Sequence, residues 1–76
     1  MADQLTFGEK AVGLGFNPSG DTTVQAIKEQ FALIIDTCHD LMEKSDDPDV
    51  RRMLAVAITE SQTAQMWAVK AVTWNK

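Results

Sequence analysis

Residues 55 to 74, AVAITESQTAQMWAVKAVTW, contain no proline or glycine and are rich in alanine, so they predict one long helix. Wound at about 100° per residue and extended back to Asp49, this helix has a smooth side of small residues and a chemically mixed side. A second helix can approach the smooth side closely. The small residues are Val50, Leu54, Ala57, Ser61, Ala64, Ala68 and Ala71, and the mixed side carries Arg52, Val56, Thr59, Thr63, Met66, Trp67, Lys70 and Trp74.

A second apolar pattern lies upstream, between Asp21 and Lys44. Its large residues recur at alternating steps of three and four, which is the spacing of a helix that packs lengthwise against a partner. Large residues here complement the small ones of the downstream helix, and this complementarity favours an antiparallel hairpin. The residues of this pattern are Val24, Ile27, Phe31, Ile34, Cys38 and Leu41.

Two polar segments separate the expected elements. In the first, Phe16-Asn17-Pro18-Ser19-Gly20, proline and glycine predict a sharp turn, after which Asp21 or one of the two following threonines caps a helix. In the second, Ser45-Asp46-Asp47-Pro48-Asp49, a short connection ends one helix and starts the next. The prediction is one all-α domain over residues 1–76, an antiparallel two-helix hairpin with arm and turn at 1–20 and helices at 21–44 and 49–74, assembled into a helical oligomer.

Size and charge limit the classes of function. A chain of 76 residues buries a small share of its surface, so oligomerisation is expected to add stability. The net charge of −4 argues against a non-specific binder of duplex nucleic acid, which needs a broad basic surface. No apolar run approaches the roughly 20 residues that span a bilayer, so we expect a soluble, cytoplasmic protein without a membrane partner.

The residues that usually carry catalysis are few. Cys38 and His39 are the only cysteine and histidine, so a disulfide within the chain is excluded, and we expect a reduced core thiol beside a surface histidine. The acidic residues of the second turn fit a solvated loop better than a calcium site. We therefore expect no catalytic residue, metal or cofactor, and an enzyme is disfavoured.

Two features indicate a focused anion site instead. The Phe16–Gly20 turn combines an aromatic ring, an amide and open backbone N–H groups beside a helix N-terminus, with Lys28 about two turns further on. The mixed side of the downstream helix adds cations and hydroxyls that symmetry could gather around one anion. The plainer alternative is that Trp67 and Trp74 fill a subunit interface while the cations are solvated.

Four segments together resemble the helical-hairpin domain of bacteriophage anti-CBASS and anti-Thoeris proteins: residues 16–20 (FNPSG) with Val24 and 26–28 (AIK), then 57–59 (AIT) and 64–71 (AQMWAVKA). The resemblance covers nearly the whole chain from Phe16 onwards. It implies a phage immune-evasion sponge that binds cyclic oligonucleotide or cyclic ADP-ribose-type messengers without cleaving them. It also implies a homo-oligomer, with a hexamer favoured, that acts in the cytoplasm of the infected bacterium.

The resemblance also implies where ligands bind. A pocket between paired subunits for cyclic dinucleotides or cyclic ADP-ribose isomers would involve Phe16, Asn17, Ser19 and Lys28. A site for cyclic trinucleotides near a three-fold axis would involve Thr59 and, as its cation, Arg52. The apolar outer side of the downstream helix predicts an oligomer interface at Met66, Trp67, Lys70 and Trp74. The rival hypothesis is a purely structural oligomerisation module of a phage assembly.

Overall fold

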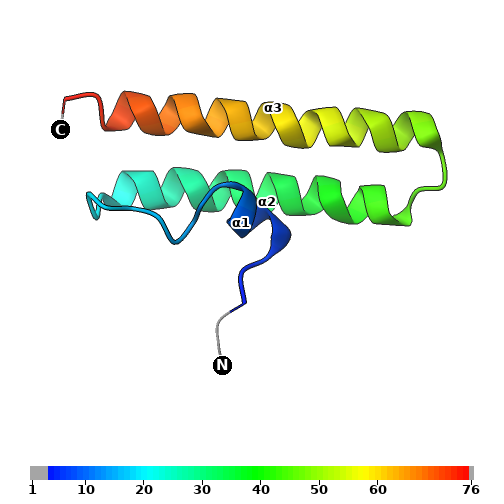
Figure 1. Ribbon diagram of the computed structural model, residues 1–76, viewed down its shortest axis with the longest axis horizontal. Helices are drawn as coiled ribbons and strands as arrows, with labels where there is room; N and C mark the ends of the chain where they lie inside the picture. The colour runs from blue at the N-terminus through cyan, green and yellow to red at the C-terminus, as the bar shows by residue number, and fades with distance from the viewer. Residues whose placement is uncertain (1–3, 76) are drawn as a thin grey trace.

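The computed structural model describes residues 4–75, and this part of the chain forms helices only. A short helix, α1 (Phe7–Ala11), precedes two long helices, α2 (Thr22–Lys44) and α3 (Pro48–Val72). The two long helices run antiparallel, side by side, and the arm that carries α1 lies against the middle of α2 (Figure 1). The expected all-α helical hairpin is confirmed.

Side chains of the turns fix the ends of the long helices. The Asp21 carboxylate caps α2 by accepting hydrogen bonds from the N–H groups of Thr23 at 2.7 Å and Val24 at 3.3 Å. Asp47 caps α3 in the same way, accepting from the N–H of Asp49 at 2.9 Å. The helices begin within one residue of the expected positions, but α3 ends at Val72, two residues early.

The buried stripe of α2 differs from the one expected. Ile34 and Leu41 are 51% and 52% exposed, whereas the neighbouring Ile35 is fully buried. The cause is the arm, which covers one flank of α2 and so shifts the buried stripe towards it, while the periodicity argument assumed a single packing partner. The buried residues of α2 are Val24, Lys28, Ala32 and Ile35.

The inner side of α3 is displaced in a similar way. Ala64 and Ala71, expected against the other helix, are exposed, while Ile58 and Gln65 are buried. Ile58 joins Val12, Ala32 and Ile35 in one small core, so the arm, α2 and α3 all contribute to it. Cys38 is a free thiol packed against this core.

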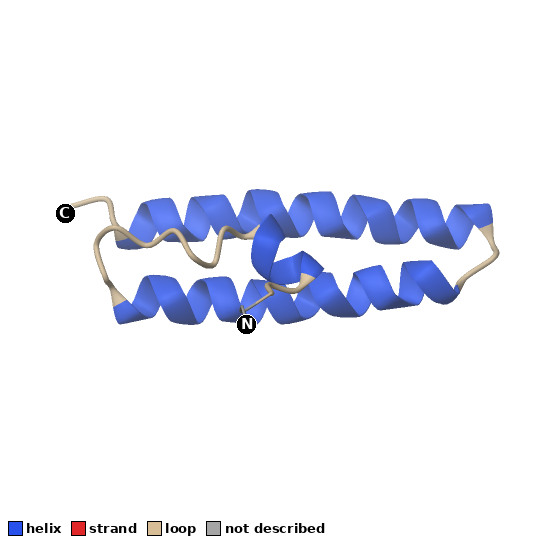
Figure 2. Cartoon of the chain, turned by 60° about the horizontal axis from the view of Figure 1, so that its bottom comes forward, coloured by secondary structure: helices blue, strands red, loops and turns tan. Residues whose placement is uncertain are grey.

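The arm is docked by specific polar and aromatic contacts. Asp36 of α2 accepts hydrogen bonds from the Thr6 hydroxyl and the Gly8 N–H, both at 2.7 Å. The Phe7 ring stacks on His39 with centroids 4.1 Å apart, so His39 is half buried and not the plain surface residue that was expected. Figure 2 shows α1 lying across the hairpin rather than extending it.

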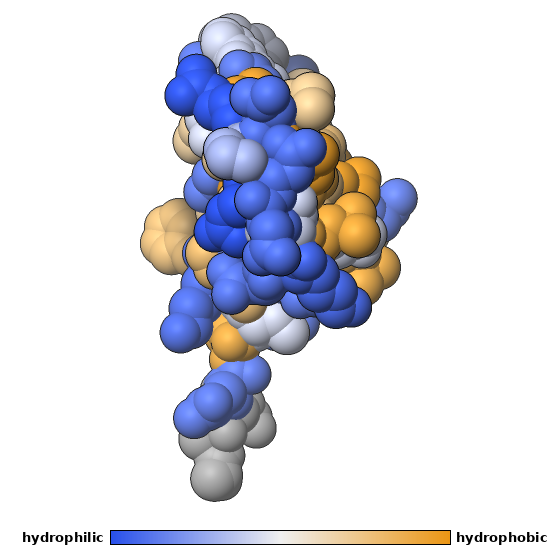
Figure 3. Space-filling model, turned by 90° about the vertical axis from the view of Figure 1, so that its right-hand side faces the viewer, coloured by the Kyte–Doolittle hydropathy of each residue, from blue (hydrophilic) through white to orange (hydrophobic). Residues whose placement is uncertain are grey.

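The molecule is a flat rod with extents of 44 × 32 × 12 Å. Seen from the hairpin-loop end, hydrophilic side chains cover the front while apolar side chains show on the flanks (Figure 3). Within residues 4–75, no helix is long and apolar enough to cross a bilayer.

Candidate functional site

The turn between the arm and α2 is held by hydrogen bonds among its own polar groups. The Asn17 side-chain amide donates to the carbonyl of Asp21 at 3.0 Å, and its oxygen accepts from the Ser19 hydroxyl at 3.2 Å. Gly20 has a φ of 66°, which glycine adopts without strain, and its N–H donates to the Asn17 carbonyl at 3.0 Å. Asn17 and Ser19 are therefore fixed in place by the turn itself.

The sequence predicted open backbone N–H groups beside this turn, but in the structure they are occupied. Two of them, at Thr23 and Val24, already donate to the Asp21 carboxylate. A carboxylate at the start of α2 also disfavours the approach of a phosphate, because like charges repel. An anion that approached the start of α2 would therefore meet a carboxylate rather than open N–H groups.

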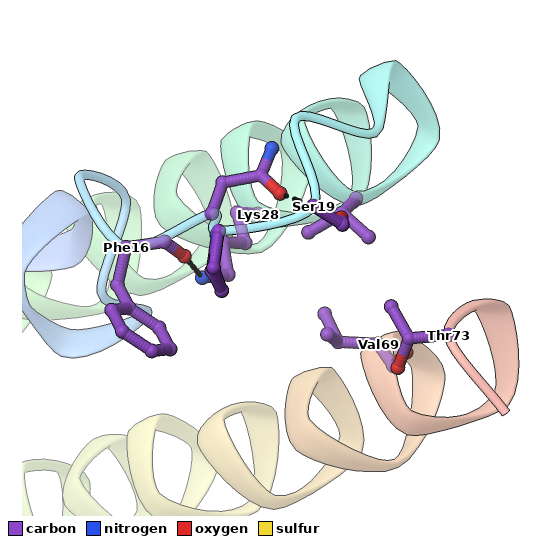
Figure 4. Close-up of a pocket in the computed structure, with 8 residues that line it drawn as sticks. Phe16, Ser19, Lys28, Val69 and Thr73 are labelled. Carbon is purple, nitrogen blue, oxygen red and sulfur yellow. Dashed lines mark hydrogen bonds between the residues drawn. The ribbon is translucent and has the colours of Figure 1, made fainter. Parts of the chain in front are cut away.

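Lys28 is the cation that lines the same hollow as this turn, and its side chain is buried rather than solvated, with 5% of its surface exposed. Its ammonium donates one hydrogen bond to the Gly13 carbonyl, at 2.9 Å. It donates another to the Phe16 carbonyl, which Figure 4 marks. The nitrogen also lies 5.6 Å from the centroid of the Phe16 ring, within cation–π range. Lys28 follows Val24 by one helical turn, so it lies on the buried stripe and its ammonium ties α2 to the arm.

Lys28 has no carboxylate partner in the described part of the chain. Between residues 4 and 75, the only pair of a basic and an acidic side chain within 4.0 Å joins His39 and Glu43, at 3.8 Å. Two carbonyl dipoles offset part of the cost of burying the ammonium, but they leave its net charge in place. An ammonium has three donors, so one N–H remains beyond the two bonds to the arm.

The turn, Lys28 and the end of α3 enclose one hollow of about 450 Å³, which lies within the range of small-molecule sites. Val69 and Thr73 of α3 face Phe16 and Ser19 across it (Figure 4). The structure thus brings together all four residues expected in the first pocket. The lining consists of Phe16, Asn17, Pro18, Ser19, Val24, Lys28, Val69 and Thr73.

A family model described as the Acb2/Tad1 hairpin domain matches residues 9–73. The chain belongs to this family. Its members are the anti-CBASS and anti-Thoeris sponges, so the resemblance found in the sequence is confirmed. The match includes every residue that lines the hollow. No curated protein and no solved structure matches the chain.

In this Acb2/Tad1 hairpin domain, Arg52 and Thr59 line a second, shallower hollow of about 300 Å³ on α3. It shares no lining residue with the first hollow, and its other residues are Ala55, Val56 and Glu60. The structure therefore brings Arg52 and Thr59 together but separates them from the Phe16 turn. Glu60 balances the charge of Arg52, so one copy of this surface holds no net positive charge.

The four residues expected at an oligomer interface do not all line one surface. Met66 and Lys70 line a further hollow with Phe16 and Lys28 on the arm side of the hairpin domain. Trp67 on α3 is 66% exposed, and Trp74, two residues beyond the end of this helix, is 70% exposed. The Lys70 ammonium lies between them, 5.2 Å and 5.7 Å from the two ring centroids.

Sequence reasoning missed the α3 wall of the first hollow and the role of the Gly13 carbonyl. Val69 and Thr73 carry no recognisable motif, and only the antiparallel register of the hairpin places them opposite the turn. The burial of Lys28 did leave a signal, because it follows Val24 by four residues on the same side of α2.

Within the described residues, no three His, Cys, Asp or Glu side chains are grouped so as to hold a metal ion.

Proposed function

We propose that this protein binds cyclic oligonucleotide second messengers and sequesters them intact, so that CBASS or Thoeris effectors of an infected bacterium are not activated. The observation that carries the proposal is Lys28, a buried ammonium at the wall of an open hollow, without a carboxylate partner among residues 4–75. Membership of a sponge family supports sequestration rather than cleavage.

The chemistry of the hollow suits a nucleotide. A buried cation is costly unless an opposite charge compensates it, and a phosphate that accepts the remaining Lys28 N–H would supply that charge. The Phe16 ring is 72% exposed and can stack on a base. At the rim, the second N–H of the Asn17 amide can donate, and the hydroxyl oxygens of Ser19 and Thr73 can accept, while their own hydrogens donate to Asn17 and Val69.

Cyclic dinucleotides are the ligands that we favour for this hollow, and cyclic ADP-ribose isomers share the same combination of ring and phosphate. For the second hollow we propose a cyclic trinucleotide held by Arg52 and Thr59 of several copies. A single copy offers one arginine beside one glutamate, so converging copies are needed to surround three phosphates. The protein would then act as a homo-oligomer, with a hexamer favoured.

One specific observation supports a second candidate, a purely structural oligomerisation module. Two large indoles, one on α3 and one just beyond its end, are more than half exposed and lie near the same Lys70 ammonium, as expected for a surface that a partner covers. This function would need neither Lys28 nor the hollow.

Calorimetric titration with a panel of cyclic dinucleotides, cyclic trinucleotides and cyclic ADP-ribose isomers separates these functions. The protein is then heat-denatured, and the released ligand is identified by chromatography. Saturable binding with recovery of intact ligand supports the sponge. Recovery of altered ligand would indicate an enzyme, and no heat of binding with any member of the panel would leave the structural module.

A further inference from the structure

Gln65 of α3 is a buried side chain whose amide has no partner in the described part of the chain. It is 5% exposed and follows Ile58 by two helical turns, so it faces the inside of the hairpin. Within residues 4–75 its side chain makes no hydrogen bond, whereas the nearby Gln62 donates to the Ala11 carbonyl at 3.4 Å. Burying an amide without a hydrogen bond costs free energy, so Gln65 calls for a partner from outside these residues.

The Gln65 amide opens into a hollow of about 570 Å³ between the arm and the end of α3. Among residues 4–75, every side-chain nitrogen or oxygen that is sealed from solvent has a hydrogen-bond partner. Both polar atoms of the unpaired Gln65 amide therefore keep an opening, and the hollow that Gln65 lines provides it. We call this the arm-side hollow, and its lining includes Lys10, Phe16, Lys28, Gln65, Met66 and Lys70.

The charged residues that line the arm-side hollow are all basic. Lys10, Lys28 and Lys70 border it, and no Asp or Glu among residues 4–75 does. These are three of the seven Lys and Arg side chains in a chain whose net charge is −4. The hollow gathers cations against the overall charge of the protein, which favours an anionic ligand.

The arm-side hollow adjoins the first hollow. Four residues line both of them, namely Phe16, Lys28, Val69 and Thr73. A single ligand can therefore extend from one hollow into the other. With one phosphate at Lys28, the second phosphate of a cyclic dinucleotide would find its cations in Lys10 and Lys70.

We propose that Gln65 reads the edge of an adenine base in the ligand of these two hollows. The N6 amino group of adenine donates and the ring nitrogen beside it accepts, so a glutamine amide can bond to adenine through both its oxygen and its nitrogen. Guanine carries two acceptors, N7 and O6, on one such edge, and these leave the amide oxygen without a donor. Phe16 and Gln65 line the same hollow, so a base stacked on the ring can present its edge to the amide. The proposal rests on the proposed function and adds a preference for adenine to it.

Gln65→Met removes the amide and keeps an unbranched side chain of similar length. Because the amide has no partner among residues 4–75, its loss should leave the melting temperature unchanged or higher. Calorimetry should nevertheless show that the variant binds cyclic di-AMP at least about 10-fold more weakly than wild type. Gln30→Met, on an exposed position of α2, is the matched control and should bind as wild type does.

The corresponding change in the ligand replaces adenine by purine, which lacks the N6 amino group. Wild type should bind this cyclic dinucleotide at least about 10-fold more weakly than cyclic di-AMP, whereas Gln65→Met should bind the two equally. The comparison within Gln65→Met also controls for any difference in stacking between the two bases. If circular dichroism shows that Gln65→Met has lost its helices, the comparison of the two ligands on wild type decides.

Two failures are distinguishable. Wild type that bound both ligands equally, or a folded Gln65→Met that bound cyclic di-AMP as tightly as wild type, would overturn the role of Gln65 and leave the proposed function standing. Wild type that bound no cyclic dinucleotide would overturn both.

Discussion

At the scale of single residues, Lys28 has a structural task as well as the proposed contact with ligand. Lys28→Ala should weaken binding of a cyclic dinucleotide by about 10- to 100-fold, because a charge-assisted hydrogen bond to phosphate is lost. It should also loosen the arm, since the carbonyls of Gly13 and Phe16 lose their donor. Calorimetry measures the first effect, and hydrogen exchange of the arm amides measures the second.

Lys44→Ala is the control for Lys28→Ala, because Lys44 is exposed at the end of α2. It removes the same charge far from the hollow and should change neither measurement. Equal affinities for Lys28→Ala and wild type at low and high salt would remove Lys28 from the ligand site.

Gly8 is the glycine with the least space around it. A Cβ at this position would collide with the carbonyl oxygen of Ala32 in α2. Gly8→Ala should therefore cost about 1 to 3 kcal/mol and lower the melting temperature by at least about 4 °C. Gly15→Ala is the matched control, because a Cβ at Gly15 meets no atom within 4 Å, and an unchanged melting temperature for both variants would contradict the close docking of α1.

At the scale of the elements, the ends of the helices could be predicted from sequence because their causes are local. Asp21 and Asp47 cap helices through residues next to them, and Pro48 occupies the first turn of α3. The buried stripe of α2 could not be predicted as reliably, because it depends on which other segments of the chain pack against each side of this helix. Ile35, and not the expected Ile34, lies in the core, because the arm is a second packing partner of α2.

In the candidate site, too, features with local causes could be predicted and features that depend on tertiary packing could not. That Phe16, Asn17 and Ser19 lie together could be predicted from the turn motif, whose geometry is encoded within a few residues. The carbonyls that hold Lys28 were not found, because a main-chain acceptor has no signature in the sequence. The contribution of α3 likewise depends on tertiary register, and nothing in the spacing of Val69 and Thr73 reveals it.

Docking of α1 depends on one carboxylate. Asp36→Asn keeps the shape of the side chain but weakens its two hydrogen bonds to Thr6 and Gly8, because a neutral acceptor replaces a charged one. We expect a loss of about 1 to 2 kcal/mol in the free energy of unfolding, measured by urea titration. Asp40→Asn, on an exposed position of the same helix, should leave the urea midpoint unchanged, and equal midpoints for both variants would show that Asp36 does not anchor the arm.

At the scale of the whole molecule, the exposed indoles should control assembly. Truncation of a tryptophan in a desolvated interface commonly costs a few kcal/mol, so Trp67→Ala should weaken self-association by about 30-fold or more. Light scattering over a dilution series measures this change. Leu33→Ala removes a side chain that is 69% exposed on α2, and an interface at Trp67 predicts no effect on association from it. A Trp67→Ala protein that kept the wild-type mass at every dilution would place the interface elsewhere.

The arm contacts have a further consequence, which concerns the order in which parts of the protein open and close. Each long helix is capped by residues that neighbour it in sequence. The arm is held by hydrogen bonds to residues distant in sequence, with separations of 15 residues for Lys28, 30 for Asp36 and 51 for Gln62. Such hydrogen bonds close large loops, and they protect few backbone amides from exchange. We therefore expect the arm to detach from the hairpin many times for each global unfolding. A ligand stacked on Phe16 and bonded to Lys28 would contact both the arm and α2, and so would hold them together. Ligand binding should therefore slow deuterium uptake in residues 7–16.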